Sequence, residues 1–201
     1  MEELKDKNGL TEKEFFEQYK PKDYKKPSVT ADIVIFQKIN SNLKLLLIKR
    51  AGHPYIGKYA LPGGFSEEGE DLLHTATREL EEETMLKNLP LEEVGLFSTP
   101  NRDPRGWVIS NAYVSLVNKE LNAVACDDAS DVKLFEVSFE EDLEKLTITL
   151  FNKEELIVEL FKEKRIGITG NIIEYKQIKS DLAFDHGEII AKALQKIKEV
   201  I

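Results

Sequence analysis

The stretch RELEEETML, residues 78 to 86, carries an arginine followed by four glutamates within five positions. On a helix, Glu79 and Glu83 lie four residues apart on one face, and Glu82 lies next to Glu79. Like charges at this spacing repel each other, so the strip needs a positive partner. Arg78 can neutralise one carboxylate, and a hard divalent cation such as Mg²⁺, which prefers carboxylate and phosphate oxygens, would neutralise the others.

The remaining residues of this helix indicate which of its faces is buried. We expect the helix from about residue 71 to residue 85. Its apolar arc consists of Leu72, Leu73, Ala76 and Leu80. On a helical wheel, Glu79 and Glu83 border this arc, so both carboxylates should lose part of their solvent. A fully solvated acidic face is the alternative interpretation.

A glycine-rich loop precedes the helix. Gly63, Gly64 and Gly69 tolerate unusual backbone angles and allow a ligand to approach the main chain. A tight turn without a binding role would explain the same glycines. Next to the glutamate helix, we expect the loop backbone to contact a metal or a phosphate.

Residues 64 to 86, GFSEEGEDLLHTATRELEEETML, resemble the Nudix box, whose pattern is Gly, five residues, Glu, seven residues, then Arg-Glu-aliphatic-x-Glu-Glu-x-Gly-aliphatic. The matching residues are Gly64, Glu70, Arg78, Glu79, Leu80, Glu82, Glu83 and Leu86. Met85 stands where the pattern has glycine, so we expect a different helix exit there. The stretches DIVIF, LLLIKR, ALPGGF, NRDPRGWVIS and LAFDHGEI are similar to the ADP-ribose pyrophosphatase-like branch.

The resemblance implies an α/β fold: a Nudix-type α/β/α sandwich with a mixed β-sheet and a β-rich insertion before the C-terminal helix. It also implies a pyrophosphohydrolase that uses Mg²⁺ or Mn²⁺ and most readily cleaves ADP-ribose to AMP and ribose 5-phosphate. Other substrates are a nucleotide sugar, NADH or a nucleoside triphosphate. The alternative function is a regulator that senses ADP-ribose without hydrolysis. Regulators of that type carry a DNA-binding domain after the helix resembling LAFDHGEIIAKAL, and we expect none in a chain that ends at Ile201.

The resemblance assigns roles by motif position. The metal ligands would be Glu79, Glu83 and Glu82, with the backbone at Gly63 and Gly64. The catalytic residues would be these three glutamates and Arg78, which would orient them, and Glu70 would support the metal site. Substrate binding is expected from Arg50, Gly64, Arg102 and Arg105.

The loop NRDPRGW, residues 101 to 107, places Arg102, Asp103 and Arg105 beside Trp107. Arginine can bind a phosphate through two parallel hydrogen bonds, and an indole ring can stack on a base. An internal brace between arginine and aspartate is the alternative for this loop.

The family usually supplies one further acid from a later loop, as a base or a metal ligand. Asp127, Asp128 and Asp131 are the candidates, although a polar turn would contain the same residues. His186, at the start of the last helix, is expected to hold local structure rather than to act in catalysis.

Composition excludes several classes of function. A net charge of -9 over 201 residues repels a phosphodiester backbone, so we expect no nucleic-acid partner. The lone Cys126 excludes an internal disulfide, and the polar opening MEELKDKNGL does not resemble a signal peptide, which together predict a cytoplasmic protein. No apolar run approaches the roughly 18 residues that span a bilayer, so no membrane partner is expected.

We expect an N-terminal arm over residues 1 to 27 and a hydrolase domain over residues 28 to 201. The arm should hold a short helix at residues 11 to 19, capped by Thr11 and Glu14. The strands are expected at residues 29 to 36, 43 to 49, 59 to 61, 91 to 98, 107 to 117 and 132 to 137. Residues 146 to 180 should form a small antiparallel insertion, which could form the surface of a homodimer. Asp185 and Glu188 should form a capping box for the last helix.

Overall fold

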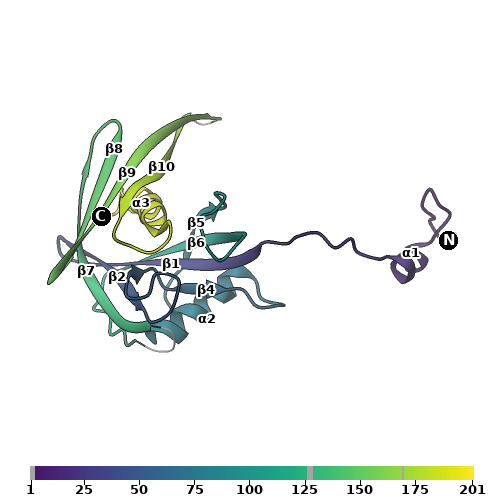
Figure 1. Cartoon of the computed structure of the whole chain (residues 1–201), viewed down its shortest axis with the longest axis horizontal. Helices are drawn as coiled ribbons and strands as arrows, with labels where there is room; N and C mark the ends of the chain where they lie inside the picture. The colour runs from purple at the N-terminus through teal and green to yellow at the C-terminus, as the bar shows by residue number, and fades with distance from the viewer. Residues whose placement is uncertain (1–2, 126–128, 169) are drawn as a thin grey trace.

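A computed structural model describes residues 3–125, 129–168 and 170–201. A mixed β-sheet in the order β10-β9-β8-β7-β2-β1-β6-β5 forms its centre, with β3 paired to β2 and β4 paired to β1 (Figure 1). The strands are β1 (Ser28–Ile39), β2 (Asn42–Arg50), β3 (Tyr59–Ala60), β4 (Gly63–Phe65), β5 (Glu92–Phe97), β6 (Val108–Val117), β7 (Ala129–Glu141), β8 (Lys145–Asn152), β9 (Glu154–Gly167) and β10 (Gly170–Ser180). The helices are α1 (Glu12–Gln18), α2 (Leu72–Thr84) and α3 (His186–Ile197).

Successive side chains of β1 point to opposite faces of the sheet and build two separate cores. Ile33 and Ile35 pack in the cluster that contains Ala76 and Leu80 of α2. Val34 and Phe36 belong to the cluster that contains the apolar residues of α3. One helix therefore covers each face, which confirms the expected α/β/α sandwich.

The strand β1 joins the antiparallel and parallel parts of the sheet. It pairs antiparallel with β2, as the expected hairpin requires, and parallel with β6. The short strand β4 was not expected, because two of its three residues are glycines and it shows no alternation of apolar and polar residues. It pairs antiparallel with β1, with Gly63 opposite Asp32, and so lies between the central sheet and α2.

The strands expected at residues 146 to 180 are present, but they are larger than a small add-on. Pairing between β7 and β8 continues the central sheet directly into β8, β9 and β10. These strands curl around α3 (Figure 1). Inward-facing Ile148, Leu150, Val158 and Leu160 are fully buried and belong to the same core cluster as α3. The insertion is therefore an integral wall of one of the two cores.

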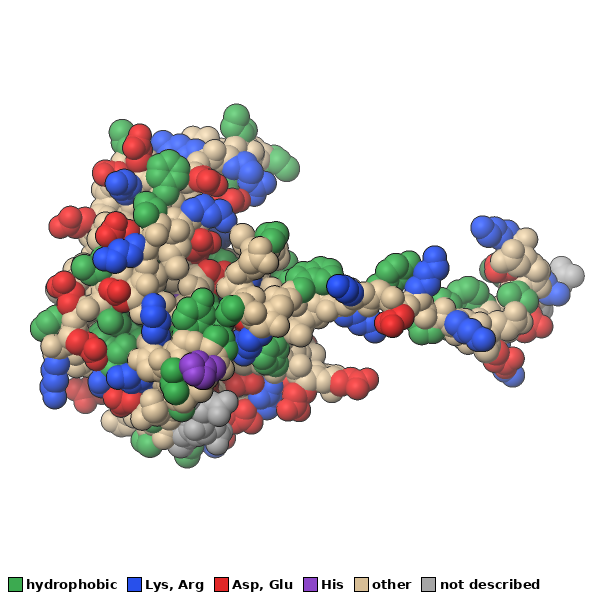
Figure 2. Space-filling model, viewed as in Figure 1, with side chains coloured by type: hydrophobic (Ala, Val, Ile, Leu, Met, Phe, Trp, Pro, Cys, Tyr) green, Lys and Arg blue, Asp and Glu red, His purple; other side chains and the backbone are tan. Residues whose placement is uncertain are grey.

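The N-terminal arm extends away from the rest of the molecule (Figure 1). Its helix α1 begins with the expected capping box: the Glu14 N–H donates to Thr11 Oγ1 at 3.3 Å, and the Thr11 N–H donates to Glu14 Oε2 at 2.8 Å. No residue of α1 is buried. Figure 2 shows hydrophobic and basic side chains along the arm. Among the described residues, no helix is long and apolar enough to cross a membrane.

Two expectations about helix ends are wrong. The Asp185 side chain makes no cap hydrogen bond, because its carboxylate accepts two hydrogen bonds from Arg102. The Glu188 carboxylate accepts from the Gln177 N–H at 2.9 Å instead of from the helix start. The exit of α2 is also not altered at Met85, which adopts the left-handed conformation with φ 61° and ψ 8° and a side chain that is 53% exposed.

Candidate active site

Helix α2 holds the glutamates against β4. Asp71 Oδ1 accepts from the His74 N–H at 2.8 Å and fixes the start of the helix. Ala76 and Leu80 are buried as expected, whereas Leu73 is 48% exposed, so that part of the expected arc was wrong. Glu83, at the border of the arc, is only 8% exposed. The helix therefore carries a carboxylate into a largely dry position.

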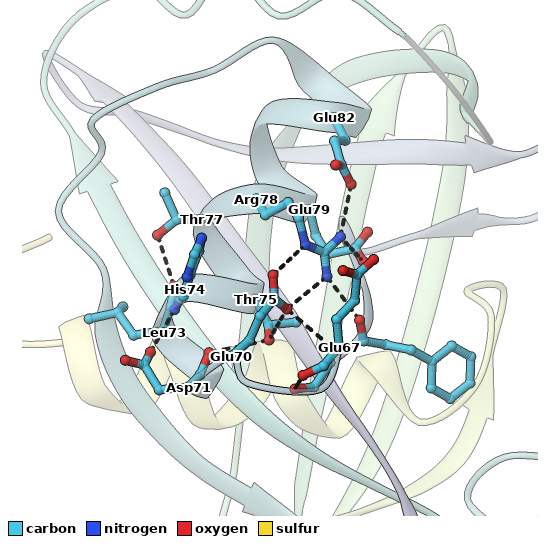
Figure 3. Close-up of polar contacts among 12 residues, drawn as sticks. Glu67, Glu70, Asp71, Leu73, His74, Thr75, Thr77, Arg78, Glu79 and Glu82 are labelled. Carbon is cyan, nitrogen blue, oxygen red and sulfur yellow. Dashed lines mark hydrogen bonds and ion pairs between the residues drawn. The ribbon is translucent and has the colours of Figure 1, made fainter.

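Arg78 connects three of the box glutamates (Figure 3). Its Nε donates to Glu70 Oε1 at 2.8 Å. Its Nη1 donates to Glu79 Oε1 at 2.8 Å and to Glu82 Oε2 at 2.9 Å. Its Nη2 donates to the Phe65 carbonyl of β4 at 3.0 Å. Arg78 thus holds three carboxylates together through its guanidinium group.

Glu70 lies in a strongly anion-stabilising environment. Besides Arg78, the Thr75 hydroxyl donates to its Oε2 at 3.0 Å and the Glu67 N–H at 3.2 Å. The Arg78 hydrogen bonds lower the pKa of Glu70 to about 2. Glu70 is therefore ionised at neutral pH and supports the site through Arg78.

Glu83 is held differently, because its Oε2 accepts from the Gly63 N–H of β4 at 2.8 Å. Burial, the largest cause, and the charges of Glu79 and Asp32 together raise the pKa of Glu83 to about 8, against the opposing effects of the Gly63 hydrogen bond and the Arg50 charge. Burial also raises the pKa of Glu79, although Arg78 opposes this. Two desolvated carboxylates therefore share a region where neither is fully compensated.

The two glycines of β4 make this region open to a ligand. A Cβ on Gly64 would lie 2.4 Å from the Glu79 carboxyl carbon. A Cβ on Gly63, which has φ +147°, would lie 2.1 Å from the Ala31 carbonyl oxygen. A side chain at Gly63 would clash with the β1 backbone and one at Gly64 would displace the Glu79 carboxylate, so the β4 backbone is open here in the sense that no Cβ separates it from that carboxylate.

The chemistry of these residues fits a divalent cation. Within the described ranges, no three carboxylate, imidazole or thiol groups form a preassembled cluster. Arg78 forms ion pairs with both Glu79 and Glu82. Glu79 and Glu83, both with a raised pKa and beside the open glycine backbone, are the pair that a hard cation would stabilise most.

Basic residues line the same cavity as the glutamates. A cavity of about 420 Å³ is lined by Glu79 and Glu83 and also by Arg50 and Arg105. Arg50 Nε donates to the Pro54 carbonyl at 2.7 Å. A smaller polar cavity of about 50 Å³ has the same two arginines in its lining, together with Phe184. The larger cavity therefore has in its lining the carboxylates of Glu79 and Glu83, here called the acidic or glutamate wall, and, besides Arg78, the guanidinium groups of Arg50 and Arg105, here called the basic wall.

The loop after β5 contains both of the arrangements that were considered for it. Arg102 is an internal brace, because its side chain is 4% exposed and its Nη2 donates to Asp185 Oδ1 at 2.6 Å. Arg105 is 39% exposed, is held by Asp103 Oδ2 at 2.7 Å, and lies over the Phe65 ring at 4.7 Å. Of the two arginines, Arg105 is the one whose side chain lies open to the larger cavity.

A buried polar network beneath the site was not predicted. Ser110 Oγ donates to Asp32 Oδ2 at 2.5 Å, and Arg102 Nη2 lies 3.5 Å from the same oxygen. His186 is buried, and its Nδ1 accepts from the Leu61 N–H at 2.8 Å. Burial lowers the pKa of His186, which keeps the ring neutral. The sequence signal was the single acid in the apolar run DIVIF.

The three candidates for an additional acid have different outcomes, because only Asp131 lies among the described residues. Asp127 and Asp128 lie outside the described residues. Asp131 is the third residue of β7, opposite Lys49 of β2, and its carboxylate pairs with Lys133 Nζ at 3.1 Å. This ion pair is consistent with a structural role for Asp131.

The chain is similar to known proteins in sequence and in fold. The ADP-ribose pyrophosphatase of Methanocaldococcus jannaschii is 39% identical over 142 residues, which are 70% of this chain and 77% of that protein. The ADPR responsive transcriptional repressor NtrR of Acinetobacter baylyi is 38% identical over 113 residues, or 55% of this chain, and the match spans 45% of the repressor's length. The crystal structure of a MutT/nudix family protein from Enterococcus faecalis matches with a TM-score of 0.72 and 33% identity, over 92% of this chain and 67% of that chain.

The family model described as NUDIX domain matches residues 26–154. This region is more than half of the chain and contains β1, the glycine strand β4 and the whole of α2. It therefore includes both Glu79 and Glu83. The chain belongs to the NUDIX domain family.

Proposed function

We propose that this protein is a divalent-metal-dependent pyrophosphohydrolase that cleaves ADP-ribose to AMP and ribose 5-phosphate. The observation that carries the proposal is the pair of desolvated carboxylates, Glu79 and Glu83, beside an open glycine backbone and in the lining of the same cavity as Arg50 and Arg105. The Methanocaldococcus jannaschii relative, named ADP-ribose pyrophosphatase, supports the choice of substrate.

The proposed chemistry divides between the two walls. Mg²⁺, or Mn²⁺ in its place, would neutralise the diphosphate and activate a water when bound by Glu79 and Glu83. Arg78 keeps Glu79 and Glu82 oriented, and Glu70 keeps Arg78 in place. Arg50 and Arg105 bind phosphate oxygens in the same cavity. One P–O bond forms to the water oxygen and one P–O bond of the anhydride breaks, which gives two monophosphates.

A substrate panel tests this function directly. The purified chain is incubated with Mg²⁺ or Mn²⁺ and with ADP-ribose, NADH, a nucleotide sugar or a nucleoside triphosphate, and the products are separated by chromatography. We expect the largest kcat/KM with ADP-ribose and no turnover in EDTA. Absence of turnover with every compound would refute the proposal, and a larger kcat/KM with another compound would replace the substrate.

The second candidate is a regulator that binds ADP-ribose without hydrolysis. The similarity to the ADPR responsive repressor of Acinetobacter baylyi favours it. Calorimetric titration with ADP-ribose and Mg²⁺ distinguishes the two functions, because a sensor gives a stable binding isotherm and unchanged ligand. A hydrolase gives AMP in the same cell.

The organisation of the chain follows from the same proposal. Residues 1–27 form an arm, and residues 28–201 form the hydrolase domain with the insertion at residues 146–180. Two copies associate as a homodimer, and exposed aromatic residues on α1 supply an apolar contact for it. The protein acts in the cytoplasm on a small nucleotide, without nucleic-acid or membrane partners; the lone cysteine and the net charge of -9 support this view.

A further inference from the structure

Phe184, in the turn between β10 and α3, is a ring that both Arg50 and Arg105 pack against. The Arg50 guanidinium carbon lies 5.1 Å from the ring centroid, and that of Arg105 lies 5.3 Å from it. Both distances fall within the roughly 6 Å at which an aromatic ring attracts a cation. The Tyr55 ring meets Phe184 edge-on at 4.9 Å. One side chain therefore contacts both cations of the basic wall.

The backbone of Phe184 is held in a conformation that a residue with a Cβ disfavours. Its φ of 52° lies in the left-handed region. Gln177 Nε2, in β10, donates to the Phe184 carbonyl at 3.2 Å. The N–H of the preceding residue, Ala183, donates to the Tyr59 carbonyl at 2.9 Å. Strands β10 and β3 thus fix the position of the Phe184 ring.

The Gln177 side chain has a cost in folding stability, and its hydrogen bond to the Phe184 carbonyl offers a reason for it. Among the described residues, no donor reaches its buried Oε1, and an unpaired buried acceptor lowers stability. A methionine would fill similar space without that cost. Gly187 permits the close packing, because a Cβ there would lie 2.8 Å from Gln177 Oε1 and 2.4 Å from Val158 Cγ1. The presence of a polar side chain here indicates that the hydrogen bond from Gln177 Nε2 to the Phe184 carbonyl has a role.

We propose that Phe184 is a positioning residue for substrate recognition. It orients the guanidinium groups of Arg50 and Arg105 toward the phosphate that the glutamate wall does not hold, and β10 keeps Phe184 in place through Gln177. This inference rests on the proposed function, because the diphosphate is the group that a cavity lined by Glu79, Glu83, Arg50 and Arg105 would bind. It assigns the insertion a role in substrate binding and none in breaking the P–O bond.

The test separates binding from turnover. In Phe184→Leu, which keeps an apolar side chain and removes the ring, we expect KM for ADP-ribose to rise about tenfold, or about 1.4 kcal/mol of binding. The kcat should stay within about twofold, because the lost contact stabilises substrate and transition state alike. Gln177→Met should raise KM by about threefold in the same direction. Phe161→Leu, the same change at a 41% exposed position of β9, is the matched control and should leave both constants unchanged.

Binding is also measured without turnover. Calorimetry with the α,β-methylene analogue of ADP-ribose and Mg²⁺ should show the same loss of affinity in Phe184→Leu. An unchanged KM in Phe184→Leu, a fall in kcat alone, or an equal effect of Phe161→Leu would overturn the inference. If the wild-type chain hydrolyses no compound, the proposed function fails, and calorimetry alone then decides the inference. Equal affinity in wild type and Phe184→Leu, or no detectable binding to the wild type, would defeat it.

Discussion

Single residues of α2 place carboxyl groups in partly or largely buried positions, which lowers the folding stability of the protein. Glu83 keeps a carboxylate in a largely buried position, with one hydrogen bond from Gly63 and the like charge of Glu79 nearby. Because the pKa of Glu83 is about 8, its buried carboxyl is ionised at pH 9; Glu83→Gln removes that charge and keeps an acceptor for the Gly63 N–H, so we expect a higher melting temperature at pH 9 in EDTA. Turnover should fall by more than about a hundredfold, since changing a residue that merely orients a ligand already costs 10- to 100-fold.

The control for this prediction lies on the same helix. Glu81 pairs with Lys87 and stands at a variable position of the box. Glu81→Gln should therefore change neither the turnover nor the melting temperature in EDTA by much. Retained turnover in Glu83→Gln would contradict the assignment of Glu83 as a metal ligand.

Met85 is the residue at which the sequence departs from its family pattern. The backbone keeps the left-handed conformation that a glycine would take, at a steric cost of about 1–2 kcal/mol. Met85→Gly removes that cost but loosens the unfolded chain by about 0.4–1 kcal/mol. We expect a net rise in the melting temperature of about 2 °C by calorimetry, with turnover unchanged. Recovery of turnover from an inactive wild type would show that Met85 affects the site itself.

At the scale of elements, the brace between the loop after β5 and the start of α3 is a buried ion pair. Arg102 contacts Asp185 and also lies 3.5 Å from Asp32. Arg102→Met leaves both acids buried without this partner, so we expect a loss of about 3–5 kcal/mol in the free energy of urea unfolding. Arg165→Met breaks the pair with Glu174 at a side chain that is 66% exposed, and should cost less than about 1 kcal/mol. Equal losses would contradict the brace.

The contact between His186 of α3 and Leu61, just before β4, should make the folding stability depend on pH. His186 accepts from the Leu61 N–H in its neutral form, and burial lowers its pKa below the unfolded value of about 6.5. Because the unfolded chain binds the proton more readily than the folded chain, the contribution of His186 to the free energy of unfolding is complete above about pH 6.5 and is lost as the pH falls below it. Urea unfolding between pH 7.5 and 5.5 should show a decline that is smaller in His186→Gln. An identical decline in both proteins would contradict this role.

The sequence predicted elements with strong local signals and missed those without them. Helix α2 carries both an N-cap acid and apolar spacing, so its bounds were nearly correct. Strand β4 has two glycines in three residues and no period to detect. The capping box at Asp185 had the right residue types, but Arg102, which is distant in sequence, binds that carboxylate. Contacts of this kind, including those of Phe184 with Arg50 and Arg105, depend on the closed fold and have no local pattern.

At the scale of the whole molecule, the arm presents an aromatic surface without a core beneath it. The Phe15 ring lies 5.4 Å from those of Phe16 and Tyr19, and all three side chains are at least 41% exposed. Residues 20 to 26 add four lysines and one aspartate to a chain whose net charge is -9. In the proposed homodimer, these lysines would meet acidic surface of the second copy and the rings would meet apolar surface.

Light scattering across a range of concentrations tests the homodimer. We expect the wild type to have twice the mass of one chain, and the double change Phe16→Ser with Tyr19→Ser to shift the equilibrium toward one chain, because the apolar contact is lost. Lys13→Ser, which leaves the rings on α1 intact, is the control and should keep the wild-type mass. High salt should weaken the dimer, since exposed lysines contribute a screened attraction. A wild type with the mass of one chain at every concentration would refute the dimer, and a dimer that survives the double change would place its interface outside α1.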